Sequence, residues 1–300
     1  MRGAAKLIDL LHLGREKVIA SYLLEGSEPA IVDCGPSTCV EALESGLAAA
    51  GLALEDVRHL ILTHIHLDHA GAAGVLVRRH PSLRVHVSAI GAPHLVDPSR
   101  LERSARRLYG DDFDFLWGEL APVPAQNVDV IGDRLLDLEA WPTPGHASHH
   151  VSFLAPDGSC FSGDATGVVI APATYVAPVA PPPDIDVEAW EASIDSIEAR
   201  SPARLCLPHW GVVEDPATHL AELRVQLRTW SERVRDGMEE EEFSAAVEAD
   251  LAAASDEETV AAYLQAAPVW QSYAGLRRYW EKRRAFVAPD KGSRSGGPVP

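Results

Sequence analysis

The stretch Thr63-His64-Ile65-His66-Leu67-Asp68-His69 places three imidazoles and one carboxylate within six positions, directly after an apolar run. Neutral imidazole together with carboxylate is the donor set that zinc takes in open, catalytic sites. Four donors this close in the chain cannot all reach one ion without strain. A turn that directs His64 and His66 towards one ion, and Asp68 and His69 towards a second ion, avoids this strain. The stretch therefore predicts a metal site.

The residues around this stretch predict an α/β fold. The run at 57–63 has the length and apolar character of a buried strand, and it delivers the histidine cluster at its carboxyl end. A helix at 70–80 and a strand at 85–88 complete a βαβ-like unit. Sheets of this class keep their sites at the carboxyl ends of strands, because the loops converge there while the sheet holds their base rigid.

Short apolar runs broken by Gly and Pro predict more strands on both sides of this unit. We expect these strands at 7–13, 18–24, 30–32, 127–131, 134–138, 151–155, 159–162 and 205–207. Helices are expected at 37–50 and 186–200, the second of them capped near Asp186. Two sheet halves flanked by helices follow from this pattern.

Two segments add helices that the sheets do not require. Residues 89–126 predict a helical hairpin that roofs the pocket, and residues 216–286 show amphipathic helical spacing throughout. A Pro-rich loop occupies 172–183. We therefore expect a catalytic domain at 1–215, a C-terminal helical region at 216–286 that could form a homodimer interface, and a disordered tail at 287–300.

The composition limits the class of partner. The 300 residues carry a formal net charge of -18, and nucleic-acid binding draws most of its affinity from Lys and Arg clusters, so no nucleic-acid partner is expected. The N-terminal apolar run is too short for a signal sequence or a membrane span. The four cysteines form no CxxC pair, which favours reduced thiols. We expect a cytoplasmic protein with a small-molecule substrate and no membrane partner.

Two ions need more ligands than residues 64–69 supply, and three later positions offer them. His146 lies just before an expected strand, whereas Asp164 and His209 each follow one. A carboxylate has two oxygens, so Asp164 is the natural bridge between two ions about 3.5–4 Å apart.

Four segments resemble the metallo-β-lactamase superfamily. They are the His-x-His-x-Asp-His run at 64–69, Thr143-Pro144-Gly145-His146, Ser162-Gly163-Asp164 and Pro208-His209-Trp210-Gly211. The segments occur in the family's order over roughly residues 7–215, and four ordered motifs are far more specific than one. The resemblance implies an αββα sandwich.

The resemblance also implies roles for single residues. The first ion would be bound by His64, His66 and His146, the second by Asp68, His69 and His209, with Asp164 as the bridge. Asp33 matches a family position whose carboxylate orients a ligand without touching the metal. His150 matches the end of the family's GHxxxH continuation and is expected to be structural.

Hydrolysis is the activity that the resemblance implies. Two divalent ions, zinc by expectation and iron or manganese as alternatives, lower the pKa of a shared water from about 15.7 towards roughly 7 and so yield a hydroxide nucleophile. The expected substrate is a thioester, lactone or phosphoester, as for glyoxalase II-like or lactonase-like enzymes. Asp68 could shuttle the proton while holding its ion. Tyr175, on the loop expected to pass over the metals, could hydrogen-bond a developing oxyanion, although a packed loop aromatic is commoner.

Single positions distinguish this chain from other members of the superfamily. Flavin-linked diiron relatives place Glu where this chain has His66, and β-lactamases with Asp-Cys-His sites tend to lack the bridging carboxylate that Asp164 supplies here. A sulfur dioxygenase with a single iron, acting on a persulfide, remains an alternative that oxygen consumption would reveal. A non-catalytic binding module is a second alternative, but structural zinc sites usually close with Cys-rich tetrahedra.

Overall fold

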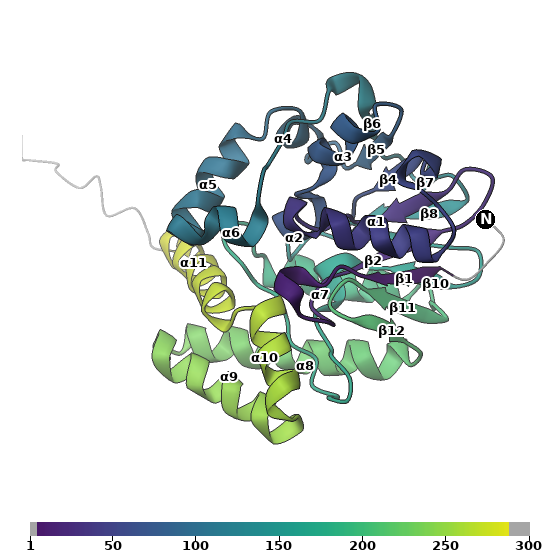
Figure 1. The fold of residues 1–300 in the computed structure, drawn as a ribbon. Helices are drawn as coiled ribbons and strands as arrows, with labels where there is room; N and C mark the ends of the chain where they lie inside the picture. The colour runs from purple at the N-terminus through teal and green to yellow at the C-terminus, as the bar shows by residue number, and fades with distance from the viewer. Residues whose placement is uncertain (1–4, 288–300) are drawn as a thin grey trace, which may run out of the picture.

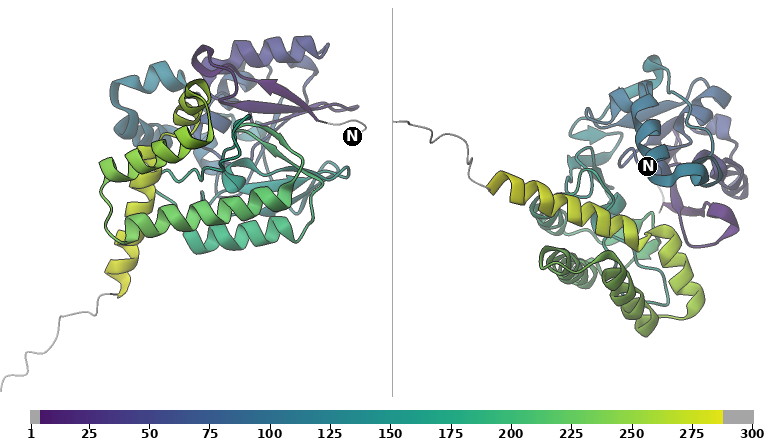
Figure 2. Two further views of the ribbon diagram at one scale, coloured as in Figure 1. Left: turned by 90° about the horizontal axis from the view of Figure 1, so that it is seen from below. Right: turned by 90° about the vertical axis from the view of Figure 1, so that its left-hand side faces the viewer.

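Two mixed β-sheets pack face to face, and helices cover the outer face of each. The computed structural model describes residues 5–287. Figure 1 gives the arrangement of the elements, and the left view of Figure 2 shows the layers, with α1 (Val40–Ala49) outside one sheet and α7 (Val187–Glu198) and α8 (Pro216–Arg235) outside the other. The predicted αββα sandwich is confirmed.

The first sheet contains six strands in the order of the sequence. They are β1 (Lys6–Asp9), β2 (Ala20–Leu24), β3 (Ala30–Val32), β4 (His59–Ile61), β5 (Arg84–Val87) and β6 (Val128–Val130). β1, β2 and β3 are antiparallel, whereas β3 to β6 run parallel. Parallel neighbours need crossover connections, and α1 and α3 (Ala73–Arg79) lie in the first two of them. The carboxyl ends of β3, β4 and β5 therefore meet at one edge of the sheet.

The second sheet has the order β12-β11-β10-β9-β8-β7. Its strands are β7 (Arg134–Leu135), β8 (Leu138–Pro142), β9 (Val151–Leu154), β10 (Ser159–Phe161), β11 (Arg204–Leu207) and β12 (Gly211–Val213). Neighbouring strands are antiparallel except β10 and β11, which run parallel and are connected through α7. The loops after β10 and β11 consequently leave the sheet at the same edge.

Alternating side chains build the core between the sheets. Along β2, Tyr22 and Leu24 pack with residues of the second sheet, while Leu23 packs with the cluster that includes the outer helices. Phe153 and Phe161 fill the same inter-sheet layer, and the ring centroids of Tyr22 and Phe161 lie 5.5 Å apart. Burial of these large rings holds the two sheets together.

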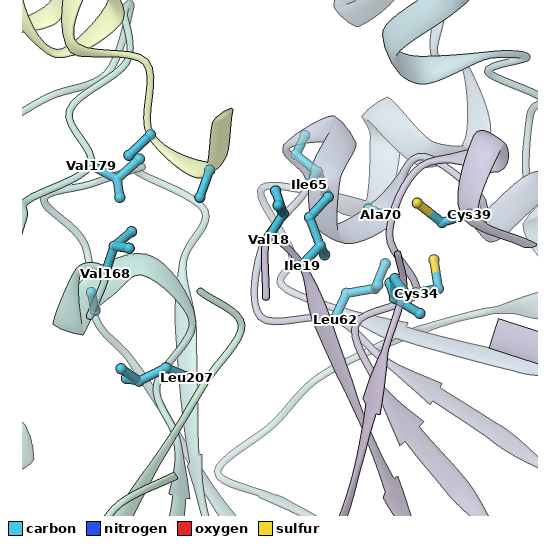
Figure 3. Packing of buried hydrophobic residues seen from close by; sticks show 14 of the residues in the cluster. Val18, Ile19, Cys34, Cys39, Leu62, Ile65, Ala70, Val168, Val179 and Leu207 are labelled. Atoms are coloured by element: carbon cyan, nitrogen blue, oxygen red, sulfur yellow. The ribbon is translucent and has the colours of Figure 1, made fainter. Parts of the chain in front are cut away.

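The four cysteines are free and buried. Figure 3 shows Cys34 and Cys39 among Leu62 and Ala70 in the apolar core. Burial, with a smaller contribution from the Asp33 carboxylate, raises the pKa of the Cys34 thiol well above its ordinary value. These thiols therefore act as small apolar side chains.

Helices occupy the two segments that the sheets do not require. Residues 89–126 contain α4 (Ala92–Val96), α5 (Ser99–Tyr109) and α6 (Phe113–Trp117). The chain beyond Pro216 continues from α8 into α9 (Glu240–Ala254), α10 (Glu257–Ala266) and α11 (Val269–Val287). Asp215 caps α8 by accepting the backbone N–H of Thr218. Within the described residues, none of the helices is both long enough and apolar enough to cross a membrane.

Several element boundaries differ from the sequence predictions. The helix expected at 70–80 is divided into α2 (Leu67–Ala70) and α3. The strand expected at 7–13 ends at Asp9, because Leu11 and Leu13 have φ values of 47° and 54° and start a 3-10 turn instead. The short 3-10 turns are η1 (His12–Gly14), η2 (Ser37–Cys39), η3 (Leu54–Asp56), η4 (Gly110–Asp112), η5 (Ala125–Asn127) and η6 (Gly163–Thr166). The tail expected to be disordered at 287–300 lies, beyond Val287, outside the described residues.

Candidate metal centre

The loop after β4 carries the histidine cluster into the interior. His64 and His69 are fully buried, and His66 stands directly before the first turn of α2. The carbonyl of His66 accepts the backbone N–H groups of His69 and Ala70, which closes that turn. The turn separates His64 and His66 from Asp68 and His69, as the sequence predicted.

The second sheet supplies three further side chains from loops at strand ends. His146 precedes β9, Asp164 lies in η6 after β10, and His209 follows β11. Gly163, before Asp164, has a φ of 49°, and a Cβ there would lie 2.4 Å from Nε2 of His150, so glycine is required at this turn. The three side chains are buried, and the candidate site therefore spans both sheets.

Seven side chains converge in two groups. In the first group, Nδ1 of His66 lies 3.1 Å from Nε2 of His64 and 2.9 Å from Nε2 of His146. The second group contains Asp68, His69, Asp164 and His209, whose ligand atoms lie within 4.8 Å of one another. The structure thus brings together the same two sets that the resemblance implied.

Asp164 stands between the two groups. Its Oδ1 lies 3.3 Å from Nε2 of His69, and its Oδ2 lies 3.4 Å from Nε2 of His146. Each carboxylate oxygen faces a different group, which is the geometry that a bridging carboxylate needs.

Hydrogen bonds to the far ring nitrogens orient two of the imidazoles. Nδ1 of His146 lies 2.6 Å from the carbonyl oxygen of Val179, and Nδ1 of His209 lies 2.6 Å from that of Val18. A carbonyl only accepts, so each ring carries a proton on Nδ1 and turns Nε2 towards the centre.

Asp33 orients a third imidazole. Its carboxylate accepts the backbone N–H of Thr63 at 2.8 Å and lies 2.9 Å from Nδ1 of His69. Asp33 has a φ of 54°, in the left-handed region that residues other than glycine rarely adopt. The strained backbone at the end of β3 thus aims this carboxylate at the back of the His69 ring.

The donor set fits metal ions. Nε2 of His69, Nε2 of His209 and both carboxylate oxygens of Asp164 are buried and have no hydrogen-bond partner among the described residues. Buried polar atoms rarely stay unsatisfied, and here they point at one another. Imidazole nitrogen and carboxylate oxygen are ligands for zinc, iron and manganese, so this buried cluster could bind metal ions.

The electrostatics of the cluster favour a neutral His64 ring and an ionised Asp164 carboxylate. Burial lowers the pKa of His64 well below its ordinary value, and His69 adds to the effect, so the His64 ring is neutral. Burial would raise the pKa of Asp164, but positive charge on His69 and His146 outweighs it and holds that pKa well below the ordinary value. The ionised carboxylate in turn raises the pKa of His69 well above its ordinary value, although burial opposes the shift, so His69 would have to release a proton in order to bind a cation.

His150 and Tyr175 lie outside both groups. Nδ1 of His150 lies 2.8 Å from Oγ1 of Thr143, and its buried Nε2 has no hydrogen-bond partner among the described residues, so its structural role stays a prediction. The oxyanion role considered for Tyr175 finds no geometric support, because its hydroxyl donates to Gln226 at 3.1 Å and accepts from the indole of Trp230 at 3.1 Å. The loop carries this phenol to the α8 side rather than over the cluster.

An open cleft of about 1090 Å³ leads to the centre, and its floor includes His66, Asp68, Asp164 and His209. The walls come from α5 and α6, from the end of the Pro-rich loop at 181–183, and from the segment that joins α10 to α11. The segment expected to roof the pocket therefore does line the cleft.

Two cleft residues escaped the sequence reasoning. Nδ1 of His149 accepts the backbone N–H of Ile65 at 3.5 Å, and the ring lies 5.4 Å from that of His66. Tyr109 lines the cleft from α5, and its pKa is raised by burial and, to a smaller extent, by the Asp68 carboxylate. His149 lies just before β9 but belongs to no matched motif, and Tyr109 lies at the end of a helix, so the packing of the roof against the site was needed to reveal them.

The comparisons with known proteins agree with this geometry. A family model described as the metallo-beta-lactamase superfamily matches residues 14–209. The metallo-beta-lactamase fold-containing protein ST1585 of Sulfurisphaera tokodaii is 29% identical over 174 residues, which cover 53% of this chain and 63% of that protein. Ribonuclease Z of a Bradyrhizobium strain is 27% identical over 154 residues, which cover 48% of this chain and 46% of that protein. The chain thus spans less than two thirds of these curated relatives.

Solved structures support the fold. The crystal structure of ST1585 superimposes with a TM-score of 0.66 at 20% identity, covering 91% of this chain and 98% of that chain. The metallo-beta-lactamase family protein TTHA1429 from Thermus thermophilus gives a TM-score of 0.67 at 21% identity, covering 94% of this chain and 93% of that chain. At this identity the likeness concerns architecture only.

Proposed function

Because the chain belongs to the metallo-β-lactamase superfamily, we propose that it is a binuclear metal-dependent hydrolase of a thioester, lactone or phosphoester. We propose zinc as the metal, with iron or manganese as alternatives. In this proposal residues 1–215 form the catalytic domain and residues 216–286 complete the wall of the cleft.

The position of Asp164 carries the proposal of two ions. Its two oxygens are buried without hydrogen bonds among the described residues, and they face separate groups of donors, through His69 at 3.3 Å and through His146 at 3.4 Å. A single ion would contact only one of these two groups of donors. Three imidazoles on one side and two imidazoles with a carboxylate on the other are complete ligand sets for two divalent ions that share Asp164.

Two divalent ions, when bound, supply Lewis acidity and lower the pKa of a water molecule towards neutrality. The side chains of the protein would hold the ions and transfer the proton. The side chain of Asp68 is 20% exposed, and its Oδ2 lies 3.4 Å from Nε2 of His209. A carboxylate in that position can hold its ion and also accept a proton from the cleft side.

A small molecule is the substrate that the cleft supports. The cleft volume of about 1090 Å³ suits a substrate of moderate size, and the net charge of -18 opposes a polyanion. The name of the Bradyrhizobium relative indicates RNA processing by that protein. We propose a different substrate class here because nothing in the composition favours phosphate backbones.

Elemental analysis of the purified full chain tests the proposal. We expect about two zinc ions, or a mixed pair, per chain, together with oxygen-independent turnover of at least one member of a panel of thioesters, lactones and phosphoesters. About one iron per chain with oxygen consumption on a persulfide would support the dioxygenase alternative instead. A metal-loaded chain that turns over nothing in either assay would support a binding module.

A homodimer through the C-terminal helices remains part of the proposal. Light scattering of the full chain measures it directly, and a monomer at all concentrations would contradict it.

A further inference from the structure

The walls of the cleft are more apolar than hydrolysis alone requires. Three aromatic side chains from separate segments line it: Tyr109 at the end of α5, Trp117 at the end of α6 and Trp270 at the start of α11. The ring centroid of Tyr109 lies 5.1 Å from that of Trp117 and 6.5 Å from that of Trp270. Figure 1 shows α5 and α6 next to α11. The two ring contacts connect the three side chains into one aromatic wall.

Aliphatic side chains extend this aromatic wall. Leu101 and Leu108 contribute from α5, and Leu264 contributes from α10. Trp270 keeps 38% of its surface exposed, although large indole side chains are usually covered. The cleft thus combines an exposed apolar wall with a polar floor. This arrangement suits a molecule that has one apolar end and one polar end.

Two polar groups of the wall already have partners, whereas Nε1 of Trp117 is buried and has no hydrogen-bond partner among the described residues. The hydroxyl of Tyr109 donates to Oε1 of Gln271 at 3.4 Å, and Nε2 of His12 lies 2.9 Å from the carbonyl oxygen of Leu116. The imidazole of His12 also stacks on Trp117 with a centroid distance of 5.6 Å. Apart from the Trp117 indole N–H, these three aromatic side chains therefore offer mainly apolar contact.

The charges around the cleft do not favour a polyanion. Above the floor, the lining contains Arg100, Arg107 and Arg278, and it also contains Asp112, Asp184 and Glu248. Three positive and three negative groups balance one another. A nucleic acid needs a track of uncompensated positive charge, which this cleft lacks among its described lining residues.

We propose that the substrate is an acyl compound, an ester, thioester or lactone, whose extended apolar chain lies along Tyr109, Trp117 and Trp270 while its scissile carbonyl reaches the floor. This inference rests on the proposed hydrolase function and names its substrate class. Each methylene buried against the wall contributes about a fourfold gain in binding or in kcat/KM, so selectivity grows with chain length until the cleft is filled.

A series of p-nitrophenyl esters from acetate to decanoate, given to the zinc-loaded full chain, tests the proposal. We expect kcat/KM to rise with acyl length. Trp270→Ala should lower the ratio of kcat/KM for octanoate over acetate by about fivefold, because it removes part of the apolar wall. Phe115→Ala is the matched control, since Phe115 is an aromatic residue of α6 that is 67% exposed and lies outside the cleft lining. That control should keep the wild-type ratio.

Binding measurements separate this inference from the proposed hydrolysis. Calorimetric titration with acetate, hexanoate and octanoate should show tighter binding of the longer carboxylates, even if no ester is hydrolysed. Trp270→Ala should reduce this dependence of affinity on chain length. Equal affinity for acetate and octanoate would overturn the inference while leaving hydrolysis intact. A change in oligomeric state of Trp270→Ala in light scattering, without any dependence on chain length, would assign the aromatic wall to contact with a second copy and would also overturn it.

Discussion

Oδ2 of Asp33 lies 2.9 Å from Nδ1 of His69, on the side of the ring that faces away from the proposed ions. The same oxygen accepts the hydroxyl of Thr63 at 2.8 Å, so the carboxylate is fixed from two directions. One carboxylate at the end of β3 thereby sets both the loop after β4 and the direction of the His69 lone pair.

Replacement of Asp33 by Asn should weaken metal binding without removing a ligand. Partners that orient a ligating imidazole typically contribute about 10-fold to 100-fold in metal affinity. Zinc affinity, measured by competition with a chelator, should fall by that factor in Asp33→Asn. Asp215→Asn, which alters the helix cap of α8, is the control and should bind zinc as the wild type does. Unchanged zinc affinity in Asp33→Asn would show that the hydrogen bond to His69 does not position the ligand.

Replacement of Asp164 by Ala should abolish activity and lower the metal content. The carboxylate faces both donor groups, so its loss removes a ligand from each. Turnover should fall by about a hundredfold or more, and elemental analysis should find fewer than two ions per chain. A fully active Asp164→Ala protein with two ions bound would refute the bridging assignment.

His149 should act on the substrate rather than on the metal. Its Nδ1 accepts the backbone N–H of Ile65, which leaves a proton on Nε2, and the residue lines the cleft. His149→Leu should lower kcat/KM on the best substrate by about fivefold to tenfold, the effect of one hydrogen bond, with the zinc content unchanged. His149→Gln keeps an N–H donor and should recover part of the loss. Equal losses in both variants would indicate packing instead.

The stability of the protein should fall in mild acid because of a histidine pair outside the site. Nε2 of His86 lies 2.8 Å from Nδ1 of His59, and burial, followed by the charge of His59, lowers the pKa of His86 to about 4. Asp129 opposes this shift and Arg84 adds to it. Between about pH 6.5 and 4 the unfolded chain binds the proton that the folded chain rejects, so the free energy of unfolding decreases as the pH falls.

His86→Gln should reduce this pH dependence. Between pH 6.5 and 4, the free energy of unfolding of the wild type should decrease by at most about 3 kcal/mol more than that of the variant. Urea unfolding at several pH values measures it, and the interval from pH 7 to 8, where His86 stays neutral in both states, is the internal reference. Parallel curves for the two proteins below pH 6 would contradict the assignment.

The convergence of the candidate ligands could be predicted from the sequence because each of them belongs to a local pattern. His64, His146, Asp164 and His209 each stand where an apolar run meets a turn, and parallel strands bring such points to one edge of a sheet. The helices of residues 89–126 and those beyond Pro216 were equally visible in the spacing of their apolar residues.

Residues whose role depends on packing between segments could not be predicted. Tyr175 was expected over the metals from its distance along the chain, yet the loop turns its hydroxyl towards Trp230. Tyr109 and Trp270 meet in the cleft although 161 positions separate them, and no local pattern encodes that contact. The strand β12 and the turn at η1 were missed because backbone angles at single residues, such as Leu11, decide them.

Because the candidate ligands come from both sheets, the proposed ions would connect the two halves of the sandwich. The group of His64 and His66 is incomplete without His146, and Asp68 and His69 need Asp164 and His209 from the other sheet. Neither half of the chain can retain an ion by itself, so occupancy and docking of the halves are linked. Free metal at about 1,000 times its dissociation constant would add about 4 kcal/mol to the stability of the assembled form. Resistance to proteolysis would then rise and fall with the metal supply around the protein.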